Sequence, residues 1–108
     1  MNRGELWTVA GGDIASKPRP ALILQDDLFD ATESVTVAPL TTTLTDAPLL
    51  RVRVPSGDLS GLARESDVMV DKLTTVRRSN VETRVGRVAA EQLAEVERSL
   101  MTFLGLAR

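Results

Sequence analysis

Two residue types are missing from the chain altogether, and both absences restrict the chemistry that it can perform. The 108 residues include no cysteine and no histidine. Without cysteine there are no disulfides and no thiolate metal ligands, and without histidine the commonest catalytic base and the commonest remaining zinc ligand are missing. Nucleophilic triads, zinc hydrolysis and histidine-pair acid–base chemistry are therefore excluded.

Aromatic residues, long apolar runs and excess charge are also scarce. Aromatics make up 3% of the chain, so the core must be built from Val, Leu, Ile and Ala, and such a small core favours dimerisation. No apolar run approaches the roughly 20 residues of a membrane span, and residues 1–5 do not begin a signal peptide, which predicts a cytoplasmic protein. The net charge is -2, so a polyanion would have to be held by a local basic patch.

The remaining pattern predicts a single domain over residues 1–108 with a β-dominated α+β fold. Short β-favouring segments lie between turn-forming residues, and they predict strands at residues 5–9, 19–25, 34–39, 50–54, 66–73 and 84–88. We expect a turn at residues 10–13, a loop or single helical turn at 26–30, and Pro39 as the end of its strand. The architecture would be a small, mostly antiparallel β-barrel or twisted sheet closed by a C-terminal helix.

The helix is predicted over residues 89–104. Its apolar residues recur at helical spacing among glutamates, and they are Leu93, Val96, Leu100, Phe103 and Leu104. Gly105 is a typical helix C-terminus, whereas the start has no Ser, Thr or Asp cap.

The most suggestive polar residue is Arg19, which stands at the start of a buried strand. With Lys17 two residues earlier and hydroxyl groups from another strand end, Arg19 could bind an anion such as phosphate through charge-assisted hydrogen bonds. The alternative from the residues alone is a surface arginine that caps a sheet edge. Trp7 could stack on a base, but a lone tryptophan on a first strand more often belongs to the core or to a dimer interface.

Several motifs appear in the order found in one known family. These are RGELW at residues 3–7, RPALIL at 19–24, VAPLT at 37–41 and VDKLTTV at 70–76, followed by VGRV at 85–88 and FLGL at 103–106. Together they cover nearly the whole chain, and the sequence resembles the MazF/PemK (Kid-like) toxins of type II toxin–antitoxin systems. The resemblance implies an SH3-like, CcdB/PemK-like fold and a homodimer. It also implies ribosome-independent, sequence-selective cleavage of single-stranded RNA such as mRNA, with no metal and no other cofactor.

In such toxins the RNA 2'-hydroxyl attacks the neighbouring phosphate, which leaves a 2',3'-cyclic phosphate and a 5'-hydroxyl. The resemblance implies catalytic roles for Arg19 and Thr41, with Asp71 as a base or orienting group. For Asp71, an ordinary paired aspartate at a strand end is the alternative. The expected RNA-binding residues are Lys17, Thr42, Lys72, Arg77 and Arg78, although a cluster of charges can also be a solvated face.

The resemblance further implies a partner, an antitoxin whose acidic peptide occupies the arginine-lined RNA groove, with DNA contacted only through that antitoxin. Two other functions stay open. A CcdB-like gyrase inhibitor acts through its C-terminal helix, but residues 103–108 lack the tryptophan of such tails. A catalytically inactive member of the fold is the second, because Met69 and Lys72 depart from the usual family pattern.

Overall fold

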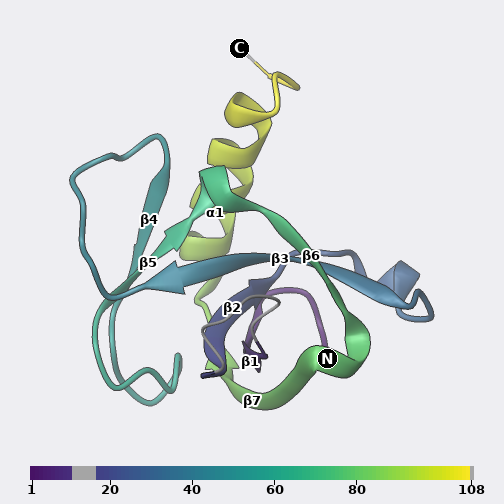
Figure 1. The fold of residues 1–108 in the computed structure, drawn as a ribbon. Coiled ribbons are helices and arrows are strands. Elements are labelled where there is room, and N and C mark those ends of the chain that lie inside the picture. The colour runs from purple at the N-terminus through teal and green to yellow at the C-terminus, as the bar shows by residue number, and fades with distance from the viewer. Residues whose placement is uncertain (11–16, 108) are drawn as a thin grey trace.

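The computed structural model describes residues 1–10 and 17–107, which form seven strands and one long helix (Figure 1). The strands are β1 (Glu5–Val9), β2 (Arg19–Ile23), β3 (Ser34–Thr41), β4 (Arg51–Val54), β5 (Ser66–Met69), β6 (Thr74–Arg77) and β7 (Val81–Arg87). The helix α1 covers Ala90–Phe103. Three single-turn 3-10 helices connect the strands, η1 (Asp27–Phe29), η2 (Val70–Lys72) and η3 (Arg78–Asn80).

The strands form one antiparallel sheet in the order β4-β5-β3-β2-β1-β7, with β6 paired to β3. Figure 1 shows β3 crossing the middle of the molecule, with β4 and β5 near its end and β1, β2 and β7 curling beneath it. No pairing between β4 and β7 closes the sheet in the described part of the chain. Of the two architectures predicted, the twisted sheet with a C-terminal helix is therefore confirmed, and the closed barrel is not formed.

The strand β3 organises the sheet because its partner changes along its length. On one edge it pairs with β2, and on the other edge residues 34–37 pair with β6 while residues 40–41 pair with β5. The prediction that Pro39 ends this strand is wrong. The Leu24 amide donates a hydrogen bond to the Thr36 carbonyl. In an antiparallel ladder, hydrogen-bonded and non-hydrogen-bonded pairs alternate, so Ala21 and Pro39, three positions further along, form a pair without hydrogen bonds between β2 and β3. The Pro39 nitrogen thus faces the gap between β6 and β5, where no amide donor is needed.

The two faces of the sheet bury separate apolar clusters. The larger cluster lies beneath α1 and is made by alternate residues of the strands with Val96 of the helix; it includes Leu6, Leu22, Ala38, Leu40, Val52, Val54, Val68 and Val70. The smaller cluster on the opposite face consists of Ala21, Ile23, Val35 and Val37, and Trp7 packs against it. Trp7 therefore belongs to the packed core, as predicted. We call the face opposite α1 the open face.

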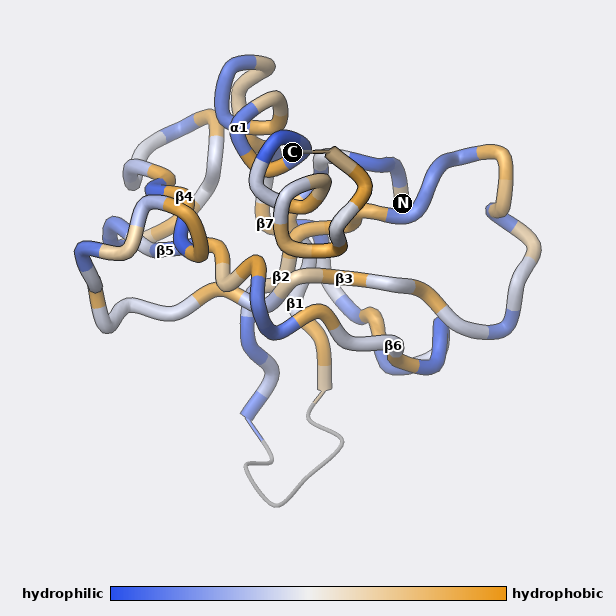
Figure 2. Tube along the Cα trace, turned by 90° about the horizontal axis from the view of Figure 1, so that it is seen from above, coloured by the Kyte–Doolittle hydropathy of each residue, from blue (hydrophilic) through white to orange (hydrophobic). Residues whose placement is uncertain are grey.

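The helix follows its predicted pattern for three of the five apolar positions. Val96 is buried and Leu93 and Leu100 are partly buried, whereas Phe103 and Leu104 are about half exposed. The Gln92 side chain accepts a hydrogen bond from the Ala89 amide, which compensates for the missing N-cap. Gly105 has a φ of 75° and ends the helix, as predicted. Figure 2 shows that this end of the chain is largely apolar, and the exposed large hydrophobic residues there are Met101, Phe103, Leu104 and Leu106.

Three segments differ from the sequence predictions. The strand predicted at residues 66–73 ends at Met69, because the chain turns into η2, and residues 74–77 form a strand that was not predicted. The final strand begins at Val81, three residues before its predicted start. Of the loop or single helical turn predicted at residues 26–30, the structure has the helical turn, η1. The turn predicted at residues 10–13 lies outside the described residues except for Ala10. No helix in the described ranges is long and apolar enough to cross a membrane.

Candidate active site

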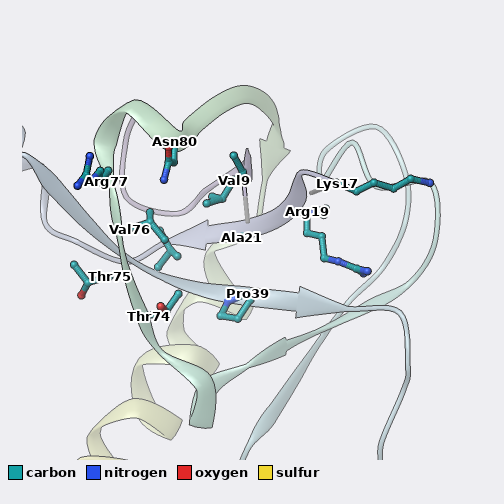
Figure 3. A pocket seen from close by; sticks show the side chains of 13 residues that line it. Val9, Lys17, Arg19, Ala21, Pro39, Thr74, Thr75, Val76, Arg77 and Asn80 are labelled. Atoms are coloured by element: carbon teal, nitrogen blue, oxygen red, sulfur yellow. The ribbon is translucent and has the colours of Figure 1, made fainter. Parts of the chain in front are cut away.

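A cavity of about 470 Å³ opens on the open face between β2, β3 and β6. Its floor is apolar, and it is formed by Val9, Pro20, Ala21, Val37, Pro39 and Val76. Three cationic side chains line it, Lys17, Arg19 and Arg77, and no carboxylate does so among the described residues. Figure 3 shows Lys17 and Arg19 at one end of the cavity and Arg77 at the other. A cavity of this size with cationic ends suits a ligand that combines flat apolar groups with negative charge.

The backbone places Arg19 beside Thr41. Strands β2 and β3 pair Ala21 with Pro39, and continuing this register by two residues brings Arg19 opposite Thr41. Directly opposed residues of antiparallel strands point to the same face, so both side chains lie on the open face. Arg19 is exposed, and Thr41 is half-buried. The Thr41 hydroxyl oxygen accepts a hydrogen bond from the Thr43 amide at 3.1 Å, which leaves its own hydrogen to donate to an anion.

The same line of opposed residues continues across two further strands. Thr41 of β3 pairs with Asp67 of β5, and Asp67 pairs with Arg53 of β4. We call Arg19, Thr41, Asp67 and Arg53 the transverse row. The Asp67 side chain is 1% exposed and accepts hydrogen bonds from Arg53 Nε at 2.8 Å, from Arg53 Nη2 at 3.4 Å and from the Thr45 amide at 3.0 Å.

These contacts keep the Asp67 carboxylate ionised. Burial acts to raise the pKa of Asp67, but the hydrogen bonds from Arg53 and the Thr45 amide and the charges of Arg53 and Arg51 outweigh it, and the pKa lies below its ordinary value of 3.8. The hydrogen bond to Asp67 in turn raises the pKa of Arg53 above its ordinary value. The pair is therefore charged on both sides throughout the physiological pH range.

Asp71 lies apart from this cavity. It stands in η2, and its carboxylate forms an ion pair with Arg51, whose Nη1 also donates to the Leu50 carbonyl. The Arg51 Nε is buried and has no hydrogen-bond partner. The structure therefore does not bring Asp71 to the cavity that Arg19 lines, and its contacts agree with the alternative of a paired aspartate.

The other sequence-predicted residues divide into two groups. Thr42 follows β3 directly and is exposed, and Lys72 is exposed in η2. Arg78 is half-buried and is used within the fold, because its guanidinium donates to the carbonyls of Phe29 and Thr32 and to the Thr32 hydroxyl. The structure thus brings together Lys17, Arg19 and Arg77 on one cavity, with Thr41 opposite Arg19 by the register of β2 and β3. Thr42, Asp71, Lys72 and Arg78 do not line this cavity.

Two features of the site were missed from the sequence. Thr74, Thr75 and Asn80 line the cavity because β6 and η3 pass over the smaller cluster, but residues 74–77 carry no apolar alternation that predicts a strand. The ion pair of Arg53 with Asp67 joins neighbouring strands. The alternation of residues 50–54 already placed both arginines on the polar face, yet only the pairing of β4 with β5 shows which acid meets Arg53.

Comparison with known proteins agrees with this geometry. Residues 2–104 match the family described as PemK-like, MazF-like toxin of type II toxin-antitoxin system. A curated relative from Mycolicibacterium smegmatis, named probable endoribonuclease MazF, is 52% identical over 108 residues, which span 99% of both chains. A solved MazE–MazF structure from Deinococcus radiodurans is similar with a TM-score of 0.82 at 25% identity and covers 99% of this chain and 97% of that one. The toxin MazF-mt6 of Mycobacterium tuberculosis is similar with a TM-score of 0.81 at 25% identity, over 96% and 99% of the two chains.

The open face, with its cationic cavity and its row of Arg19 and Thr41, belongs to a fold shared with small bacterial toxins. The chain is a member of the PemK-like, MazF-like family of type II toxin–antitoxin toxins. The resemblance drawn from the sequence motifs is thereby confirmed.

Proposed function

We propose that the protein is the toxin of a type II toxin–antitoxin pair and an endoribonuclease that cleaves single-stranded RNA without a metal and without the ribosome. The observation that carries the proposal is the cavity with Lys17 and Arg19 at one end and Arg77 at the other, in a member of a family whose relative at 52% identity is named a probable endoribonuclease. The apolar floor suits unstacked bases, and the cationic ends suit the phosphates on either side. No observation favours the gyrase-inhibitor alternative.

The reaction requires stabilisation of a pentacoordinate phosphorus. The RNA 2'-oxygen forms a bond to phosphorus and releases its proton to water, while the bond from phosphorus to the 5'-oxygen breaks and that oxygen takes up a proton from water, so that the two proton transfers balance. Arg19 is placed to donate hydrogen bonds to the oxygens that gain charge, and the free hydrogen of Thr41 supports it from the neighbouring strand. The products are a 2',3'-cyclic phosphate and a 5'-hydroxyl. Arginine keeps its proton at neutral pH, so Arg19 acts as a donor rather than as a base.

The remaining polar side chains either bind RNA phosphates or stabilise the fold around the site. In this proposal Lys17, Thr42 and Arg77 hold RNA phosphates on either side of the cleaved bond, and exposed Lys72 contacts the RNA further along. Arg78 fixes the segment around Phe29 and Thr32, as its hydrogen bonds indicate. Asp71 takes no proton from the RNA, because its carboxylate is occupied by Arg51.

The partners and the compartment are part of the same proposal. The fold is shared with a MazF solved together with MazE, which supports an antitoxin as the binding partner, with any DNA contact made through that antitoxin. The exposed apolar residues at the end of α1 support a homodimer, because a second copy would cover them. We place the protein in the cytoplasm, where its RNA substrate is found, and treat residues 1–108 as one toxin domain.

The test is an assay on a long mixed-sequence RNA in buffer that contains EDTA. We expect discrete fragments, and mass spectrometry should find 2',3'-cyclic phosphates at the new 3' ends and hydroxyl groups at the new 5' ends. An RNA that stays intact at micromolar protein would overturn the proposal. Inhibition of gyrase supercoiling by the same preparation would establish the protein-binding alternative in its place.

A further inference from the structure

One buried charge of the open face has no part in the mechanism given above. Asp67 is 1% exposed, in a row of otherwise accessible polar side chains. Burial of a carboxylate costs several kcal/mol unless it is paired and hydrogen-bonded, and an apolar residue at this position would avoid that cost. Asp67 is paired and hydrogen-bonded, so what it does is decided by how it holds Arg53 and the Thr45 amide.

The geometry of the ion pair defines how Arg53 is held. Asp67 accepts from Nε and Nη2 of Arg53, which is a two-point contact along one side of the planar guanidinium. The Nη1 end has no hydrogen-bond partner among the described residues, and the Arg53 side chain is 45% exposed. The guanidinium is therefore held in one orientation by Asp67, and its exposed Nη1 side is open to an anion, which would bind within reach of the Glu65 and Asp46 charges that also act on Arg53.

Asp67 also holds the backbone of the segment that follows β3. Its second oxygen accepts from the Thr45 amide, and the Thr41 hydroxyl accepts from the Thr43 amide. The segment from Thr41 to Thr45 thus continues from β3 at one end and is held by Asp67 at the other. The carboxylate that orients Arg53 therefore also fixes the backbone beside the catalytic threonine.

Arg19 and Arg53 lie at the two ends of the transverse row, so the number of strands between them gives their separation. Arg19 and Arg53 stand on opposite sides of Thr41, three strand spacings apart, which is about 14 Å between their backbones at about 4.8 Å per spacing. A single strand of RNA laid across β2, β3, β5 and β4 would therefore meet Arg19 at one phosphate and Arg53 at another.

We propose that Arg53 is a second phosphate-binding arginine for RNA and that buried Asp67 is the positioning residue that aims it. The inference rests on the proposed RNA cleavage and adds the direction of the RNA, away from the cavity and across β5 to β4. Arg53 touches a phosphate remote from the cleaved bond, so it contributes to binding of substrate and transition state equally.

The experiment measures cleavage of one mixed-sequence RNA in EDTA at several KCl concentrations. We expect Arg53→Gln to raise KM about tenfold at 0.15 M KCl with kcat within about twofold of wild type. The slope of log(kcat/KM) against log[KCl] should become shallower by about 0.7, the value for one phosphate contact on a single strand. Arg53→Lys keeps the charge and should keep most of the slope. Arg87→Gln is the matched control and should behave as wild type. Arg87 is exposed and pairs with Glu5 at the start of β1, at the opposite end of that strand from Val9, which lines the cavity.

The role of Asp67 is tested by coupling. Asp67→Asn can still accept from the Thr45 amide but no longer holds the guanidinium by charge, so we expect it to raise KM as Arg53→Gln does. In the double variant Asp67→Asn with Arg53→Gln, which also removes the unpaired buried charge, the two effects should not add. Thermal unfolding of each variant measures how much the substitution destabilises the fold, separately from its effect on KM.

Three outcomes would overturn the inference. The first is a wild-type salt slope in folded Arg53→Gln or in the double variant. The second is a loss of kcat in Asp67→Asn with no effect of Arg53→Gln, which would make Asp67 a support for Thr41 alone. The third is a wild-type protein that cleaves no RNA at all, which defeats the proposed function as well and is distinguished from the first two by the wild-type control.

Discussion

The carboxylate of Glu5 joins the first strand to the last, and its removal should weaken the fold in a pH-dependent way. Glu5 accepts hydrogen bonds from the Asn2 amide at 2.7 Å, from Trp7 Nε1 at 3.0 Å and from Arg84 Nε at 2.9 Å. Burial acts to raise the pKa of Glu5, but these bonds and the charge of Arg84 outweigh it and lower the pKa from 4.5 to about 2. The ionised form is therefore the one that the folded protein stabilises.

The size of the effect follows from this pKa. At about 1.4 kcal/mol per pH unit, the difference between 4.5 and about 2 corresponds to at most about 3.5 kcal/mol. Arg84 is about half exposed, so solvent screening reduces the contribution, and we expect about 1–2 kcal/mol. Because the folded pKa is the lower one, this stability is fully present above pH 4.5 and is lost as the pH falls from 4.5 towards 2.

The measurement is urea unfolding of wild type and Glu5→Gln at pH 7 and at pH 3, followed by circular dichroism and by the fluorescence of Trp7. We expect Glu5→Gln to lose about 1–2 kcal/mol at pH 7 and clearly less at pH 3. Glu82→Gln, which removes an exposed carboxylate on β7, serves as control and should lose little at either pH. An equal loss for Glu5→Gln at both pH values would refute the electrostatic reasoning.

Two further predictions concern the scaffold and the site. A Cβ at Gly86 would lie 2.2 Å from the Ser60 carbonyl oxygen, so Gly86→Ala should lower the unfolding free energy by about 3 kcal/mol or more, and a thermal melt within a few degrees of wild type would contradict this contact. Gly57→Ala meets nothing within 4 Å and should lose only the cost of its positive φ, about 1–2 kcal/mol. Thr41→Ala should lower kcat for RNA cleavage by about 100-fold while Thr41→Ser keeps most of it, and equal activity of all three proteins would remove Thr41 from the mechanism.

Much of the sheet could be predicted because its signals are local. Strand β4 alternates apolar and charged residues, and residues 18–23 combine two prolines with a short apolar run, so both strands are recognised within a few residues of sequence. Strand β6 could not be predicted, because its residues are exposed or half-buried and its conformation depends on pairing with β3. The continuation of β3 through Pro39 likewise depends on the change of its partner strand, which no local pattern contains.

The site residues likewise fall into those that local sequence predicts and those that depend on the pairing of distant strands. Arg19 and Lys17 could be selected because a strand that begins with prolines places its first side chains at the mouth of the sheet. Asp71 was expected in a strand that continues to Leu73, but η2 turns its carboxylate to Arg51. The pairing of Arg53 with Asp67 links residues 14 positions apart through the register of β4 and β5, and charge patterning along the sequence does not give that register.

The most direct test of the central claim compares wild type with Arg19→Ala in cleavage of one RNA in EDTA. The matched variant Arg98→Gln changes an exposed arginine on α1, on the opposite face of the sheet. We predict that Arg19→Ala cleaves about 100-fold to 1,000-fold more slowly than wild type, that its thermal unfolding is unchanged, and that Arg98→Gln keeps full activity. Cleavage by Arg19→Ala at the wild-type rate would contradict the claim that phosphate chemistry on the open face is centred on Arg19.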